Sequence, residues 1–169
     1  MGIIVGCGNL PTKGEFMAKI LSIDPSGTGK TGTCLIEGSK ITFQEFKSKD
    51  WEEHLVFISE ILWDYQPDVI LYENTHHIHS QTKDGMSLFR LLGAIQSLPA
   101  DRVKKAHILV HQVKDLKAKL LKETKQIPEL TFKKGRGKGW IFENKRISLH
   151  ELDAYLVYWL WKEKGGKCE

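Results

Sequence analysis

The sequence is poor in cysteine and has no long hydrophobic run. Its three cysteines stand far apart at Cys7, Cys34 and Cys168, so neither a disulfide framework nor a zinc knuckle is expected. No apolar stretch approaches the ~18 residues that a membrane-spanning helix needs. The first residues also lack the charged and apolar segments of a secretory signal. We therefore expect a protein of the reducing cytoplasm with no membrane partner.

The residues that are present suit one globular domain. The chain has 169 residues, of which 41% are hydrophobic and 27% are charged. A chain of this length can bury a core without disulfides or a structural metal. Residues 1–16 are punctuated by glycine and precede a cleaner start at Met17. We expect 1–16 to be a leader or cloning-derived extension and 17–169 to form the domain.

Charge is distributed unevenly along the chain. The formal net charge is +4, but residues 102–146 hold 14 of the 25 Lys and Arg and only 4 of the 21 Asp and Glu. The rest of the chain is therefore acidic overall. A concentrated basic segment indicates a polyanionic partner, and acidic residues elsewhere are candidate ligands for metal ions.

Hydrophobic periodicity predicts five strands and four helices. The expected strands cover 18–24, 31–37, 40–46, 68–73 and 106–111, and the expected helices cover 50–65, 86–98, 113–125 and 148–164. Residues 126–143 are expected to form a long Lys/Gly-rich loop. Three antiparallel strands followed by two α/β units predict an α/β protein with a five-stranded mixed sheet flanked by helices.

One segment comes close to a phosphate-binding P-loop. Residues 24–31 read DPSGTGKT, with Asp24 where the motif requires glycine. A P-loop must also open a helix, because the helix N-terminus holds the phosphate, whereas a β-branched run follows here. A P-loop-type nucleotidase that uses Lys30 is therefore a less favoured alternative.

Acidic residues recur at the ends of predicted elements. Asp24 ends the first strand, Glu73 ends the fourth, and Asp153 lies in the first turns of the last helix. If the two strands are neighbours, Asp24 and Glu73 emerge side by side. Grouped carboxylates repel one another unless a cation neutralises them, and oxygen ligands favour Mg²⁺ or Mn²⁺.

The start of the last helix adds a second pattern. His150 and Asp153 are three residues apart and share a helix face, so His150 is a further candidate for the site. Glu151 fits better as the N3 residue of a capping box with Ser148 than as a metal ligand.

These motifs together resemble a known family. ILSIDPSGTGKTG, VILYEN and SLHELDAYLVY are similar to the corresponding segments of RuvC-like Holliday junction resolvases, especially the small phage-type members, in the RNase H-like superfamily. The resemblance runs from about Met17 to Lys164. It aligns Asp24, Glu73, His150 and Asp153 with the catalytic and metal-binding positions of the family.

The resemblance implies an activity. It implies an RNase H-like fold and a homodimer that cuts four-way and other branched DNA in paired fashion, leaving 5′-phosphate ends. Two Mg²⁺ or Mn²⁺ ions per active site would clamp the scissile phosphate. His76 stands where many relatives have an aromatic wedge and His77 follows it, so both are candidate DNA contacts. A binding protein with a weakened catalytic site, in which His150 no longer supports a second metal, is the alternative.

The basic segment is the candidate DNA-binding surface. Lys133, Lys134, Arg136 and Lys138 alternate with glycines that permit close approach to a backbone, and Lys114 and Lys117 extend the positive charge along a predicted helix. Such cations neutralise phosphates without reading sequence. Trp140 either stacks on a base or anchors this segment on the core.

Overall fold

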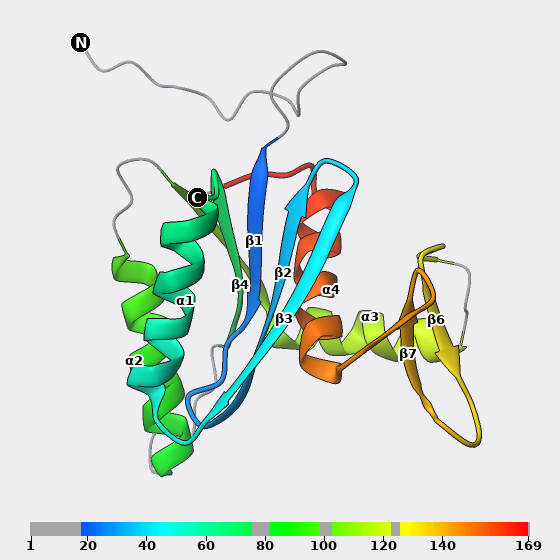
Figure 1. Ribbon diagram of the computed structural model, residues 1–169, viewed down its shortest axis with the longest axis horizontal. Helices are drawn as coiled ribbons and strands as arrows, with labels where there is room; N and C mark the ends of the chain where they lie inside the picture. Colours follow the sequence, from blue (N-terminus) through cyan, green and yellow to red (C-terminus); the bar gives the residue numbers. More distant parts are fainter. Residues whose placement is uncertain (1–17, 76–81, 99–102, 123–125, 169) are drawn as a thin grey trace.

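A five-stranded mixed sheet forms the centre of the molecule. The computed structural model describes residues 18–75, 82–98, 103–122 and 126–168. The sheet order is β3-β2-β1-β4-β5, with β1, β2 and β3 antiparallel and β4 and β5 parallel to β1 (Figure 1). The strands are β1 (Lys19–Asp24), β2 (Gly29–Glu37), β3 (Lys40–Ser48), β4 (Val69–Asn74) and β5 (Lys104–Leu109). The predicted fold class is confirmed.

Helices cover both faces of this sheet. The helices are α1 (Trp51–Tyr65), α2 (Lys83–Ser97), α3 (Val110–Lys122) and α4 (Leu149–Glu163). In Figure 1, α1 and α2 lie together on one face, while α4 lies on the other and contacts α3. The predicted boundary of α1 is confirmed, because the Asp50 carboxylate accepts a hydrogen bond from the Glu52 N–H and Gln66 ends the helix in a left-handed conformation.

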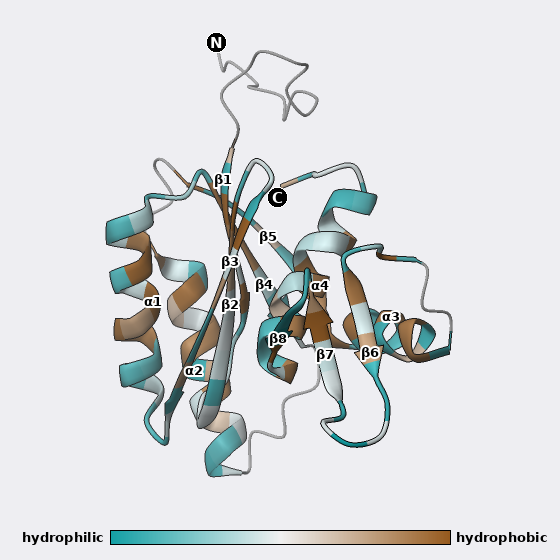
Figure 2. Cartoon of the chain, turned by 45° about the vertical axis from the view of Figure 1, so that its right-hand side comes forward, coloured by the Kyte–Doolittle hydropathy of each residue, from teal (hydrophilic) through white to brown (hydrophobic). Residues whose placement is uncertain are grey.

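The alternation of side chains along β1 divides the core in two. Leu21 and Ile23 pack toward α1 and α2, and Ile20 packs toward α4. Between them, the buried Ser22 hydroxyl donates to the Ala154 carbonyl of α4 at 2.7 Å. Both faces of β1 are therefore covered by helices. Figure 2 shows hydrophobic residues between the sheet and these helices.

The predicted long loop over 126–143 is wrong. This segment contains β6 (Leu130–Lys133) and β7 (Gly139–Phe142), which pair with each other, and β8 (Lys145–Ile147) completes a separate three-stranded antiparallel sheet. Each strand is only three or four residues long and is separated from the next by a polar turn. The apolar alternation was therefore too short to predict strands.

Aromatic side chains fix this small sheet to the main core. The Phe142 ring lies 5.1 Å from the Phe43 ring of β3 and 5.0 Å from the Tyr155 ring of α4, both in edge-to-face geometry. Trp140 is 4% exposed, so of the two roles considered for it the anchoring role is confirmed.

Three further expectations from the sequence concern membrane spans, the first residues of the chain and two histidines. No helix in the described ranges is long and apolar enough to cross a bilayer. The expected leader at 1–16 and the candidate contacts His76 and His77 lie outside the described residues.

Candidate active site

Asp24 and Glu73 emerge next to each other at one edge of the central sheet. β1 and β4 are parallel neighbours, and the paired residues Ile23 and Tyr72 directly precede the two acids. Strand alternation turns both carboxylates toward the α4 face. Together with Asn74, they line a hollow of about 60 Å³. The predicted meeting of the two strand ends is therefore observed.

The first turns of α4 bring two more candidates to this edge. The Ser148 hydroxyl accepts from the Glu151 N–H at 3.1 Å, and the Glu151 carboxylate accepts from the Ser148 N–H at 2.7 Å. This capping box fixes the start of the helix, and Glu151 is therefore a capping residue. His150 and Asp153 project toward the strand ends, where each contacts a partner described below.

The backbone of α4 sits directly on β2 at Gly32. A Cβ atom added to Gly32 would lie 2.2 Å from the His150 carbonyl oxygen and 2.7 Å from the Glu151 nitrogen. Only glycine permits this approach. The absent side chain at Gly32 is thus what lets the helix carry His150 to Asp24.

His150 is paired with Asp24. The His150 Nδ1 and the Asp24 Oδ2 are 2.8 Å apart. The hydrogen bond to Asp24 raises the pKa of His150, as do the charges of Asp24, Glu45 and Asp153, in spite of partial burial. Burial raises the pKa of Asp24, and Asp153 adds to this while His150 and Lys117 oppose it.

Lys117 of α3 neutralises Asp153. Its ammonium donates to both carboxylate oxygens at 2.7 Å, and both side chains are partly buried. The contact was not anticipated, because Lys117 was predicted to bind DNA. No pattern along the sequence relates it to Asp153, since 36 positions separate the two and only the packing of α3 on α4 joins them.

The pKa of Glu73 depends on the other acids of the site. Burial and the nearby Asp24 and Asp153 carboxylates together raise the pKa of Glu73 to about 8, although Lys117 and Lys114 act against them. Three carboxylates are therefore close enough to influence one another. Such a group is stabilised by a cation of higher charge than a lysine ammonium.

The donor chemistry fits a hard divalent cation only in part. Asp24, Glu73 and Asp153 offer carboxylate oxygens, which Mg²⁺ and Mn²⁺ favour. In the described part of the chain, however, no three His, Cys, Asp or Glu side chains converge on a common metal position. The Lys117 ammonium and the His150 ring already lie against Asp153 and Asp24, so both side chains would have to move for the carboxylates to share an ion.

Comparison with known proteins gives a structural likeness and no sequence match. No family model and no curated protein matches the chain. Thermus thermophilus RuvC in complex with a Holliday junction substrate superposes with a TM-score of 0.62 at 14% identity, covering 90% of this chain and 98% of that one. A second Thermus thermophilus RuvC structure gives 0.54 at 17% identity, covering 89% and 98%. The chain has the RNase H-like fold of RuvC.

A less similar structure is YeaZ from Pseudomonas aeruginosa. It superposes with a TM-score of 0.48 at 8% identity, covering 89% of this chain and 94% of that one. This likeness is too low to support an argument about the chain.

Within the RuvC fold, the P-loop interpretation is wrong. The segment after the glycines is β2, not a helix, and the Lys30 ammonium lies 2.6 Å from a Glu45 carboxylate oxygen. A Cβ atom on Gly27 would lie 2.1 Å from the Leu88 nitrogen of α2. The glycine-rich loop is therefore a packing element that supports α2.

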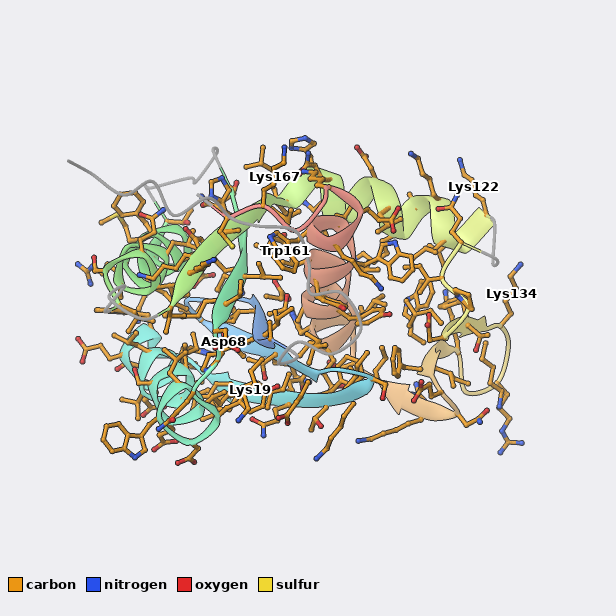
Figure 3. All side chains as sticks on the ribbon, turned by 90° about the horizontal axis from the view of Figure 1, so that it is seen from above. Lys19, Asp68, Lys122, Lys134, Trp161 and Lys167 are labelled. Atoms are coloured by element: carbon orange, nitrogen blue, oxygen red, sulfur yellow. The ribbon has the colours of Figure 1, made fainter. Side chains whose placement is uncertain are left out.

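The predicted DNA-binding cations occupy two places. Lys133, Lys134, Arg136 and Lys138 are exposed at the end of β6 and in the turn to β7. Lys114 is exposed on α3, one helical turn before Lys117. Figure 3 shows Lys122, at the far end of α3, and Lys134 at the same end of the molecule. Arg146 of β8 was not among the predicted DNA-binding residues. Its charge is evident from the sequence, but the strand that carries it was not predicted.

Proposed function

We propose that this protein is a metal-dependent, structure-specific endonuclease that resolves Holliday junctions and other branched DNA in the cytoplasm. The observation that carries the proposal is the meeting of Asp24 and Glu73 at adjacent strand ends, with Asp153 of α4 close enough to raise the pKa of both. The RuvC structure of the same fold is in complex with a Holliday junction substrate, which supports branched DNA as the substrate.

The proposed activity needs divalent cations. Asp24, Glu73 and Asp153 would hold two Mg²⁺ or Mn²⁺ ions, with His150 as a further ligand. When bound, such ions supply an activated water and stabilise the departing 3′ oxygen of a phosphodiester, leaving a 5′-phosphate. The His150 ring shares a hydrogen bond with the Asp24 carboxylate through Nδ1, so proton exchange with water or substrate would use the other ring nitrogen, Nε2.

In this proposal Lys117 contacts Asp153 before metal binds and the substrate phosphate afterwards. Its ammonium neutralises Asp153 and would leave that carboxylate when metal arrives. The displaced Lys117 ammonium would then be available to the substrate phosphate, as would Lys114 on the same helix. The exposed cations Lys133, Lys134 and Arg136, with Lys138, bind the backbone of the substrate farther away.

A second copy of the chain completes the proposal. A four-way junction offers two symmetric strands for cutting, and a two-fold homodimer matches that symmetry. α2 exposes Phe89 and Met86, which are 61% and 38% accessible. These apolar side chains are the proposed dimer contact.

A cleavage assay on a synthetic four-way junction tests the function. The wild-type protein with Mg²⁺ or Mn²⁺ should give paired symmetric nicks with 5′-phosphate ends. Asp24→Asn, Glu73→Gln and Asp153→Asn should each lower cutting by at least a hundredfold while the junction is still bound. Glu60→Gln, an equal change of charge on the exposed side of α1, should cut as the wild type does.

A junction-binding protein with a weakened site is the second candidate. It is favoured by the Lys117 ammonium and the His150 ring, which already lie against Asp153 and Asp24. This protein would bind the four-way junction without cutting it in any divalent ion. The same assay separates the two candidates, since nicking by the wild type that Asp24→Asn abolishes excludes the binding-only protein.

A further inference from the structure

The small sheet has one face in the core and one face turned outward. Trp140, Phe142 and Ile147 are buried on the inner face. The strand register puts the intervening residues on the outer face, where Lys133 pairs with Gly139 and Ile141 pairs with Arg146. Two cations from different strands therefore share this outer face.

Gly139 gives Arg146 its position. A Cβ atom on Gly139 would lie 3.1 Å from the Arg146 Nη2, so the guanidinium crosses the strand where a side chain is absent. There Nη2 donates to the Lys138 carbonyl at 2.9 Å. This bond holds the β6–β7 turn against β8. It does not use Nη1 and Nε of Arg146, which are both hydrogen-bond donors.

The outer face is hollowed between these two cations. The hollow measures about 220 Å³ and is lined by Lys133, Gly137, Gly139, Ile141, Asn144 and Arg146. These six residues are two cations, one amide, two glycines and one isoleucine, and none of them is an acid. A planar guanidinium with spare donors beside a lysine ammonium is suited to a phosphate group.

The hollow is held at a fixed orientation to the candidate active site. β8 ends at Ile147, and the next residue, Ser148, is the N-cap of α4, which carries His150. In Figure 1 the turn between β6 and β7 and the first turn of α4 both lie toward the lower side of the molecule. A substrate at the carboxylates that extends sideways thus meets the small sheet.

We propose that the outer face of β6–β7–β8 binds a backbone phosphate of a duplex DNA arm at a distance from the bond that is cut, through Arg146 and Lys133. This inference rests on the proposed function, because it takes branched DNA as the ligand. The contact adds affinity and orients the arm without reading sequence, since phosphates carry no sequence information. It contributes nothing to the cutting step itself.

The salt dependence of DNA binding tests this site. Binding of a four-way junction is measured in EDTA, which prevents cutting, over a range of salt concentrations. Arg146→Gln should weaken binding several-fold and make the slope of log K against log salt shallower by about 0.9, the value for one lost phosphate contact. Lys145→Gln removes an equal charge from the neighbouring position of β8, which faces away from the hollow, and should leave the slope unchanged. Equal slopes for the two variants contradict the proposal.

A second variant controls for the structural role of Arg146. Lys133→Gln removes a cation from the same hollow without touching the bond between Arg146 and Lys138, and it should lower the slope to a similar extent. A change in Arg146→Gln alone would show that the turn was merely loosened, and would overturn the site. If the wild type cuts junctions but these slopes do not change, only this inference fails. If the slopes change but the wild type never cuts, only the proposed function fails.

Discussion

Lys117 is the residue on which the chemistry of the candidate site depends. Its ammonium donates to both oxygens of Asp153, so it does for one carboxylate what a metal ion would do for several. A monovalent ammonium and a divalent ion cannot occupy the same oxygens together. In the proposed function, Lys117 and a metal ion would therefore compete for Asp153.

We predict that Lys117→Gln lowers stability without metal and strengthens metal binding. The loss should be roughly 1–3 kcal/mol, because hydrogen bonds to a charged group are removed and Asp153 is left partly buried. Thermal unfolding with and without Mn²⁺ measures both effects, and the Mn²⁺-dependent rise in Tm should exceed that of the wild type. Lys114→Gln, exposed on the same helix, is the control. A smaller Mn²⁺ response in Lys117→Gln would contradict the competition.

The surroundings of His54, outside the candidate site, predict that the stability of the protein depends on pH. The side chain is fully buried, its Nε2 donates to the Ser48 carbonyl at 3.2 Å, and its Nδ1 lies 2.9 Å from the Thr31 hydroxyl. Because a carbonyl only accepts, the neutral ring carries its proton on Nε2. Burial lowers the pKa of His54, although the Ser48 carbonyl and the Glu53 and Asp50 carboxylates oppose this.

The sign of the effect follows from the lowered pKa. The unfolded chain takes up a proton near pH 6.5, while the native ring resists it, so His54 supports stability above that pH and the support is lost as pH falls through the native pKa. Urea unfolding between pH 8 and 5 should show a decline that His54→Gln reduces by up to about 1.4 kcal/mol per pH unit. His111→Gln, exposed on α3, should follow the wild-type curve. An unchanged decline in His54→Gln would contradict this assignment.

At the scale of elements, the contact between β2 and α4 sets the site. A methyl group on Gly32 would meet the backbone of His150 and Glu151, and backbone cannot rotate away as a side chain does. Gly32→Ala must therefore push the first turn of α4 off the sheet. We expect a loss of about 1–3 kcal/mol in the free energy of unfolding and a loss of junction cleavage beyond what that destabilisation explains.

Gly93→Ala is the matched control for this prediction. Gly93 lies inside α2 and a Cβ atom there would meet nothing within 4 Å. The change should stabilise the protein by roughly 0.5–1 kcal/mol, because alanine favours a helix over glycine. Chemical denaturation of both variants measures the two opposite shifts. A Gly32→Ala protein as stable and active as the wild type would mean that α4 is held by other contacts.

Elements with a clear local signal could be predicted from the sequence. β1 and β4 are short, but each has a run of four buried, mainly apolar residues, and the capping residues Asp50 and Ser148 mark where helices begin. These signals are local, so the five-stranded sheet followed from them. Because Asp24 and Glu73 stand at the ends of these two strands, their proximity could be predicted as well.

The small sheet and the Lys117 contact could not be predicted in the same way. β6 and β7 are each four residues long, which is too short for an alternating pattern to stand out from a loop rich in lysine and glycine. The pairing of Lys117 with Asp153 depends on how α3 packs on α4. Tertiary packing of this kind leaves no period in the sequence.

At the scale of the whole molecule, four of the six large apolar side chains exposed in the described part of the chain lie on two helices on one face of the sheet. Phe89 and Met86 are exposed on α2, and Trp63 and Val56 are exposed on α1. α2 follows β4, which ends in Asn74 directly after Glu73, whereas the exposed side of α1 lies among acids such as Glu60. If two copies met at the α1 patch, the acids of one copy would lie against the same acids of the other and repel them. The α1 patch is therefore expected to face solvent.

Phe89→Glu should therefore convert a dimer into a monomer. Burying a charge in an isologous contact repeats the cost on both copies, so one substitution acts twice. Light scattering after gel filtration should give the mass of two chains for the wild type and of one, 19.3 kDa, for the variant. On a four-way junction the variant should leave single nicks in place of paired cuts, because two sites no longer arrive together. Trp63→Glu, which adds the same charge on α1, should stay dimeric, and a monomeric Trp63→Glu with a dimeric Phe89→Glu would move the contact to α1.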